Sequence, residues 1–210
     1  MKDKIPEPKN GIQYLYEDIK EIAERFPTDY KWNYEELCNH FPEDLLVKVE
    51  IIDNRLFVYP SPTLEHQDIL GNILIKFHRF IKDDNLGQLL LAPLDVQLDQ
   101  NNVVQPDILF ITKANRKILG EATIEGAPNL IIEIWLPMES LEMREAKREL
   151  YQKNEVTEFW QIYPKKKQVC VEVLNEEGKY QTFSEAEKKG IIKSKVLTGF
   201  EIDIADIFES

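Results

Sequence analysis

The chain has 210 residues, of which 43% are hydrophobic, and it carries 26 Lys and Arg against 38 Asp and Glu, a formal net charge of −12. This length and hydrophobic content indicate one substantial domain, with room for a short extension. The acidity argues against a dedicated non-specific nucleic-acid binder, whose surface should be basic, but it leaves a nuclease open because the local field near a cleft matters more than the total charge.

Targeting and redox signals favour a cytoplasmic protein. No apolar run approaches the roughly 18 residues that a membrane span needs, and the N-terminal MKDKIPEPKNG lacks the apolar core of a signal peptide. Cys38 and Cys170 form neither a metal-ligand spacing nor a disulfide framework, so we expect two buried, reduced thiols.

The N-terminal part of the chain predicts two short helices. Apolar residues at helical spacing favour a helix over Gly11–Phe26. A second helix is expected within Tyr30–Phe41, with Asn33 as its N-cap. We therefore divide the chain into an N-terminal arm and helix, residues 1–32, and a main domain, residues 33–210.

Alternating and continuous apolar runs predict the strands. Leu45–Ile52 and Arg55–Tyr59 flank the two-residue turn Asp53-Asn54, a strong hairpin pattern. Further strands are expected at Leu86–Leu91, Leu94–Leu98, Pro106–Thr112, Leu130–Leu136, Phe159–Tyr163, Val169–Leu174 and Tyr180–Phe183. Mixed with helices in this order, they predict an α/β fold with a mixed sheet and helices on both sides.

The longest predicted helix runs over Thr63–Asp84 and brings two polar residues close to the core. Its apolar residues recur at three and four, so one face is buried. His66 lies on that face and Glu65 beside it. Each has an ordinary interpretation: a core histidine with its hydrogen bonds satisfied, and an acid near the positive end of the helix dipole. The alternative is that both belong to a functional site.

Two carboxylates in predicted strands are the main candidates for such a site. Asp107 opens one strand, and Glu133 interrupts Leu130–Leu136, which is apolar on both sides of the alternation and should be buried on both faces. A lone charge there costs several kcal/mol or more, so Glu133 needs a cationic partner. That partner is either a metal ion shared with Asp107 or a side chain in a core ion pair.

Lys147 is the candidate side-chain partner. It lies in the helix predicted from about Glu139 to Asn154, and it shares one face with Met143, Leu150 and Tyr151. An inward-facing lysine without a counter-charge would lose its proton or disturb the packing. We therefore expect its amine within hydrogen-bonding reach of Glu133 or of a metal-bound water.

Six blocks of sequence carry a resemblance to a known family. They are VEIIDNRLFVYPSPTLEHQ (49–67), APLDVQL (92–98), VVQPDILFI (103–111), GAPNLIIEI (126–134), KRELYQKNEVTEFWQIYP (147–164) and VLTGFEIDIADIF (196–208). Together and in this order, the blocks resemble the Uma2 family of restriction endonucleases, a branch of the PD-(D/E)XK nuclease superfamily. The resemblance covers most of the chain.

The resemblance implies a restriction-endonuclease-like domain, a mixed β-sheet flanked by α-helices, that cleaves DNA. It implies Asp107 and Glu133 as ligands of Mg²⁺, with Mn²⁺ as an alternative, and Glu65 as a further acidic ligand supported by His66. The catalytic lysine, absent two residues after Glu133, would be Lys147. Cleavage of both DNA strands would suit a homodimer.

The chain departs from the family pattern at two positions. Leu136 stands where a small polar residue is usual, and Met143 stands where an acidic residue is usual one helical turn before the lysine. These departures favour a second hypothesis, a catalytically weakened relative that binds nucleic acid or a protein partner without cleaving it. Retention of Asp107, Glu133 and Lys147 favours a Mg²⁺-dependent endonuclease.

Overall fold

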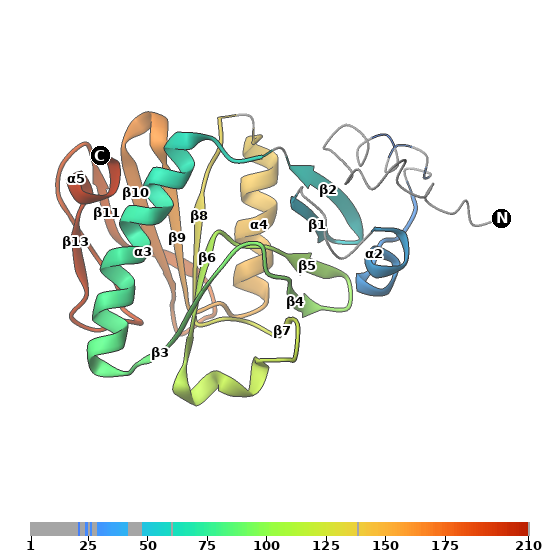
Figure 1. Ribbon diagram of the computed structural model, residues 1–210, viewed down its shortest axis with the longest axis horizontal. Helices are drawn as coiled ribbons and strands as arrows, with labels where there is room; N and C mark the ends of the chain where they lie inside the picture. The colour runs from blue at the N-terminus through green and yellow to red at the C-terminus, as the bar shows by residue number, and fades with distance from the viewer. Residues whose placement is uncertain are drawn as a thin grey trace, which may run out of the picture.

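A six-stranded mixed sheet forms the centre of the described structure (Figure 1). The structure, a computed structural model, describes residues 21, 24, 26, 29–41, 48–59, 61–137 and 139–209. In spatial order, the strands of this sheet are β11 (Tyr180–Glu187), β10 (Gln168–Leu174), β9 (Glu158–Tyr163), β8 (Leu130–Ile134), β6 (Ile108–Thr112) and β3 (Gly87–Leu91). β8 pairs antiparallel with β6 and parallel with β9, so it is an interior strand, as its apolar residues on both sides of the alternation predicted.

A second sheet lies beside the first and contains the predicted hairpin. Its spatial order is β2 (Arg55–Tyr59), β1 (Lys48–Ile52), β5 (Asn102–Val104), β4 (Val96–Asp99) and β7 (Ile124–Glu125). Asp53 and Asn54 both have positive φ angles, 49° and 64°, as a two-residue hairpin turn between twisted strands requires. The hairpin is confirmed; residues 45–47 of its first predicted strand lie outside the described residues.

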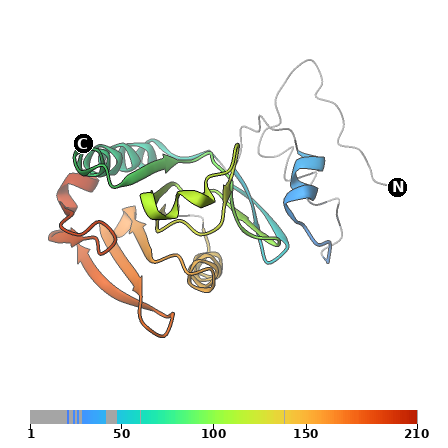
Figure 2. The same cartoon turned by 90° about the horizontal axis from the view of Figure 1, so that it is seen from below.

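Two long helices cover opposite faces of the central sheet (Figure 2). The helices with described bounds are α2 (Tyr34–His40), α3 (Leu64–Asp84), α4 (Leu141–Lys153) and α5 (Ile204–Phe208), with 3-10 turns η2 (Lys113–Ile118) and η3 (Pro164–Lys166). Thr63 and Ser140 begin α3 and α4 as N-caps, since their hydroxyls accept the N–H groups of His66 and Met143. No helix in the described part of the chain is both long and apolar enough to cross a membrane.

The alternation of side chains in β6 and β8 separates the two cores. Phe110 and Ile132 point to the face that α3 covers, and Leu109 and Ile131 point to the face that α4 covers. On the α3 side, the C-terminal hairpin of β12 (Ile191–Lys193) and β13 (Glu201–Asp203) and the short helix α5 extend the core, so the C-terminal segment packs against the central sheet and α3.

Three sequence-based expectations concern the N-terminal helices and the two cysteines. The N-cap role of Asn33 is confirmed, because its side chain accepts the Glu36 N–H at 2.9 Å. Cys38 and Cys170 are free thiols, but the expectation that both are buried is wrong: Cys38 is exposed on α2. Most of the predicted helix over Gly11–Phe26, and most of the arm of residues 1–32, lies outside the described residues.

Candidate active site

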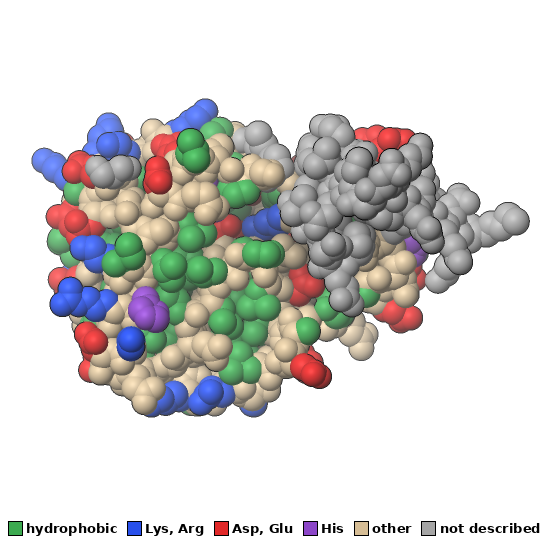
Figure 3. All heavy atoms as spheres, in the orientation of Figure 1, with side chains coloured by type: hydrophobic (Ala, Val, Ile, Leu, Met, Phe, Trp, Pro, Cys, Tyr) green, Lys and Arg blue, Asp and Glu red, His purple; other side chains and the backbone are tan. Residues whose placement is uncertain are grey.

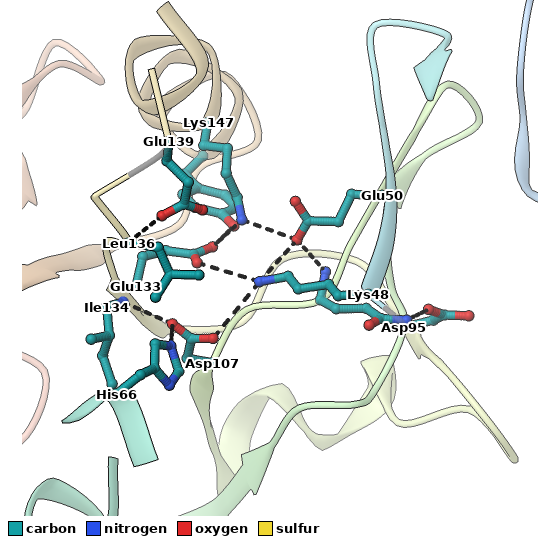
Figure 4. Close-up of polar contacts among 12 residues, drawn as sticks. Lys48, Glu50, His66, Asp95, Asp107, Glu133, Ile134, Leu136, Glu139 and Lys147 are labelled. Carbon is teal, nitrogen blue, oxygen red and sulfur yellow. Dashed lines mark hydrogen bonds and ion pairs between the residues drawn. The ribbon is translucent and has the colours of Figure 1, made fainter. Parts of the chain in front are cut away.

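Three elements bring the predicted site residues together at one end of the central sheet (Figure 4). Asp107 directly precedes β6, Glu133 lies within β8, and Lys147 lies in the second turn of α4. Because β6 and β8 are antiparallel, with Ile108 opposite Ile132, the start of β6 lies beside the end of β8. The pairing of these two strands therefore places the two carboxylates next to each other.

Glu133 and Lys147 form a buried ion pair. The Lys147 Nζ lies 2.6 Å from Glu133 Oε1, and Lys147 is fully buried. The hydroxyl of Tyr151, one turn later on α4, donates to the same Glu133 oxygen. The predicted proximity of the Lys147 amine to Glu133 is confirmed, and the apolar face of α4 explains it, since that face directs Lys147 and Tyr151 together toward β8.

Asp107 is held as an ionised carboxylate by fixed donors. Its Oδ2 accepts the backbone N–H of Ile134 at 2.8 Å and lies 3.2 Å from His66 Nε2, so the proton of that imidazole is on Nε2 when His66 is neutral. Burial alone would raise the pKa of Asp107, but the Lys48 ammonium and the hydrogen bonds from His66 and Ile134 outweigh it and lower the pKa to about 2.

Lys48, on β1, extends the site toward the second sheet. Its Nζ lies 3.5 Å from Glu50 Oε1, 3.7 Å from Asp107 Oδ1 and 3.8 Å from Glu133 Oε2. Burial would lower the pKa of Lys48, but these three carboxylates together raise it well above its usual value. The ammonium therefore stays charged at the point on which the three carboxylates converge.

Glu50 is a fully buried member of the site that the sequence-based prediction missed. Its Oε1 accepts the backbone N–H of Gln105 at 2.8 Å and the Lys147 ammonium at 3.0 Å. Burial would raise the pKa of Glu50, but Lys147 and Lys48 lower it. Glu50 stands between the apolar residues Val49 and Ile51 of a predicted strand, which is the kind of signal that singled out Glu133.

Glu139 also borders the site, and Glu65 does not. The Glu139 carboxylate accepts the N–H of Leu136, and burial raises its pKa to about 7, an effect that Lys147 partly offsets. Glu65 is exposed in the first turn of α3, while the next residue, His66, is buried and faces Asp107. The structure leaves the Glu65 carboxylate exposed and does not bring it into this group, so Glu65 is not among the metal ligands proposed below.

A cavity of about 790 Å³ opens beside these charged groups. Lys48, His66, Asp107 and Glu139 line one part of its wall, and apolar side chains from α2, β3 and the segment after β8 line much of the rest. On the face of the molecule in Figure 3, hydrophobic side chains gather over α3 and β3, whereas the described Lys and Arg side chains lie mainly around the margin. The cavity, rather than a basic stripe on this face, is therefore the place where a ligand would meet the charged groups.

The chemistry of the donors fits a hard divalent cation. Carboxylate oxygens are the ligands that Mg²⁺ and Mn²⁺ prefer, and oxygens of Asp107, Glu133 and Glu50 face one point. The Lys48 ammonium occupies that point, and its Nζ lies 3.5–3.8 Å from the three carboxylate oxygens. Mg²⁺ needs its ligand oxygens at about 2.0–2.1 Å. Consistent with these longer distances, no group of three or more His, Cys, Asp or Glu side chains in the described ranges is already arranged to hold a metal ion.

Comparisons with known proteins support the fold and the family. Residues 33–205 match the Uma2 family, described as "Putative restriction endonuclease". The structure is similar to that of "a putative nuclease belonging to DUF820" from Anabaena variabilis ATCC 29413, with a TM-score of 0.63 and 19% identity over 76% of this chain and 89% of that chain, a likeness of fold alone. No protein with a curated description matches. Because the family match spans most of the chain, the protein belongs to the Uma2 family of restriction-endonuclease-like proteins.

Proposed function

We propose that this protein is a metal-dependent endonuclease that hydrolyses phosphodiester bonds of DNA. The observation that carries the proposal is the meeting of Asp107, Glu133 and Lys147, from three separate elements, beside a cavity of about 790 Å³. Membership of the Uma2 family supports nuclease chemistry in particular. Asp107 and Glu133 are the proposed ligands of Mg²⁺ or Mn²⁺; exposed Glu65 is not used.

Each proposed ligand has one oxygen fixed and one available. The Oδ2 of Asp107 is held by His66 and the Ile134 N–H, which leaves Oδ1 toward Lys48. The Oε1 of Glu133 is likewise held by Lys147 and Tyr151, which leaves Oε2. A bound Mg²⁺ would polarise the scissile phosphate and lower the pKa of a coordinated water.

Lys147 would act from beside the carboxylates. Its ammonium is fixed by Glu133 and Glu50, so it presents positive charge at a constant place without needing to reorganise during the reaction. There it can position the attacking water or stabilise negative charge that develops on the phosphate. His66 supports the site indirectly, because it orients Asp107 and keeps it ionised.

A catalytically weakened binding protein is the second candidate. The observation that favours it is the full burial of Lys147, whose ammonium already has two carboxylate partners and the Trp135 ring 5.9 Å away. An ion pair that only stabilises the core would have the same geometry. The apolar residues Leu136 and Met143, at positions where the family pattern is polar or acidic, point the same way.

Cleavage assays distinguish the two candidates. Supercoiled plasmid, linear duplex, single-stranded DNA and RNA would be incubated with the wild type in Mg²⁺, Mn²⁺ or EDTA, beside Glu133→Gln, Asp107→Asn and the matched control Glu65→Gln on the exposed face of α3. We expect metal-dependent DNA cleavage that Glu133→Gln and Asp107→Asn reduce by roughly a hundredfold or more, with Glu65→Gln unchanged. A wild type that cleaves nothing with either metal would favour the binding protein.

Lys147→Ala tests the lysine separately. If Lys147 is catalytic, the folded variant should lose cleavage and keep its Mg²⁺ affinity. A folded Lys147→Ala protein that still cleaves would remove Lys147 from the mechanism.

Because cleavage of both strands of a duplex suits two symmetric sites, we further propose a homodimer. The molecular mass in solution, measured by light scattering, would test it.

A further inference from the structure

Lys48 occupies the position that the proposed metal ion would need. Its ammonium lies between the available oxygens of Asp107 and Glu133, at 3.7 and 3.8 Å, and 3.5 Å from Glu50 Oε1. None of these distances is a short hydrogen bond, whereas Lys147 contacts its two carboxylates at 2.6 and 3.0 Å. Lys48 is therefore held mainly by the summed charge around it and not by a fitted hydrogen-bond geometry.

Exposure makes the same distinction between the two lysines. The Lys147 side chain is 0% exposed, but that of Lys48 is 21% exposed and lines the cavity. Lys48 can therefore move its ammonium toward solvent by changing side-chain torsions, while Lys147 has no such path. The nearby ring of Tyr59, 5.2 Å from the ammonium, offers an aromatic surface along the cavity wall.

Charge balance favours a divalent ion that replaces the Lys48 ammonium over one that is added beside it. The carboxylates of Glu50, Asp107 and Glu133 with the ammoniums of Lys48 and Lys147 carry one net negative charge. A divalent ion added to this set would leave one positive charge in a largely buried place. A divalent ion that replaces the Lys48 ammonium leaves the set neutral, which costs less when charges are buried.

We propose that Lys48 is a built-in counter-cation that competes with the divalent metal ion, so that the metal binds Asp107 and Glu133 only when the Lys48 ammonium has moved out into the cavity. This inference rests on the proposed metal site. Without metal, Lys48 keeps three neighbouring carboxylates from repelling one another; with metal, the displaced ammonium faces the cavity, where a substrate phosphate would be its new partner.

Metal affinity measured without substrate tests the competition. Mn²⁺ alone would be titrated by calorimetry into the wild type, Lys48→Met and the control Lys76→Met, whose lysine lies at an exposed ion pair with Asp206. Loss of the competing ammonium should lower the Kd for Mn²⁺ by roughly tenfold or more, with Lys76→Met unchanged. In EDTA, Lys48→Met should melt at a lower temperature than the wild type. Mn²⁺ should raise the melting temperature of Lys48→Met by more than it raises that of the wild type.

The outcomes separate this inference from the proposed function. Equal or weaker Mn²⁺ binding by Lys48→Met, with binding by the wild type retained, would overturn the competition and leave the metal site standing. If neither protein binds Mn²⁺, both proposals fail. If Lys48→Met does not fold in EDTA, refolding in Mn²⁺ supports the inference, and failure of Mn²⁺ to restore the fold overturns it.

Discussion

Two buried carboxylates on neighbouring strands, Glu158 at the start of β9 and Glu133 in β8, differ in the groups that contact their oxygens. Glu158 is fully buried, and both its oxygens are filled by neutral donors. Its Oε1 accepts from the Trp160 indole and the Ser194 hydroxyl, both at 2.6 Å, and its Oε2 accepts the N–H groups of Lys195 and Val196, both at 2.7 Å. No cation is needed there, because four fixed dipoles satisfy the charge.

Glu133 is satisfied at only one of its two oxygens. Lys147 and Tyr151 hold Oε1, while the nearest cation to Oε2 among the described ion pairs is the Lys48 ammonium at 3.8 Å. Glu158 thus has hydrogen-bond donors from the protein at both of its carboxylate oxygens. The carboxylates of the candidate site instead keep oxygens facing the Lys48 ammonium, and this difference supports the proposal that the site is functional.

Removal of Lys147 should have the largest effect on stability. Lys147→Met leaves Glu133 and Glu50 buried with fewer partners, and we expect a loss of roughly 3–5 kcal/mol in the free energy of unfolding, measured by urea denaturation. Adding Glu133→Gln to Lys147→Met should cost less than the sum of the two single changes, since one unpaired charge is then removed. Strict additivity would show that the two groups do not interact.

Glu158→Gln should destabilise the fold without touching metal binding. The amide presents its own N–H groups to the four donors around Glu158, so at least one buried donor loses its acceptor, at a cost of roughly 2–3 kcal/mol. Mn²⁺ titration of the folded variant should give the wild-type Kd. A loss of Mn²⁺ affinity as large as that of Glu133→Gln would remove the distinction between the two carboxylates.

Glu139→Gln should change how stability depends on pH. Because the folded pKa of Glu139, about 7, lies above its ordinary value of 4.5, ionisation of Glu139 weakens the folded state as pH rises between these values. The variant cannot ionise there. Its stability relative to the wild type should therefore rise by roughly 1–2 kcal/mol from pH 4.5 to pH 8. Urea denaturation at both pH values measures the free energy of unfolding of the two proteins. A difference between them that is the same at both pH values would contradict the raised pKa.

Lys76→Met should have the smallest effect. The Lys76–Asp206 pair joins α3 to α5 at 2.7 Å, but both side chains are about half exposed, at 47% and 49%. Water and salt screen such pairs, so we expect a change below about 1 kcal/mol. A larger loss in thermal denaturation would mean that ion pairs of this protein cannot be ranked by burial.

The parts of the fold that local pattern determines were predictable from the sequence. The period of apolar residues and the Thr63 cap define α3, and the apolar residues on both sides of the alternation in β8 predict its interior position. Glu133 and Lys147 stood out because each is a charged residue in an apolar setting. The division of the strands into two sheets was not predicted, because it depends on which hairpin pairs with which strand across long stretches of chain.

The missed and misplaced residues of the site have similar physical causes. Glu50 meets Lys147 across 97 residues of sequence, a contact that no local pattern records. Lys48 looks like an ordinary lysine at the start of a hairpin strand until the second sheet brings it to Asp107. Glu65 and His66 differ by one position, which is about 100° around a helix, so the same turn that buries His66 exposes Glu65.

Crystals grown with Mn²⁺ would test the central claim most directly, since anomalous scattering locates this ion without reference to activity. We predict a single Mn²⁺ peak bound by Asp107 and Glu133, with the Lys48 ammonium displaced from its position between them into the cavity. A map with no peak at these carboxylates at millimolar Mn²⁺, or with Lys48 unmoved and the metal elsewhere, would contradict the account.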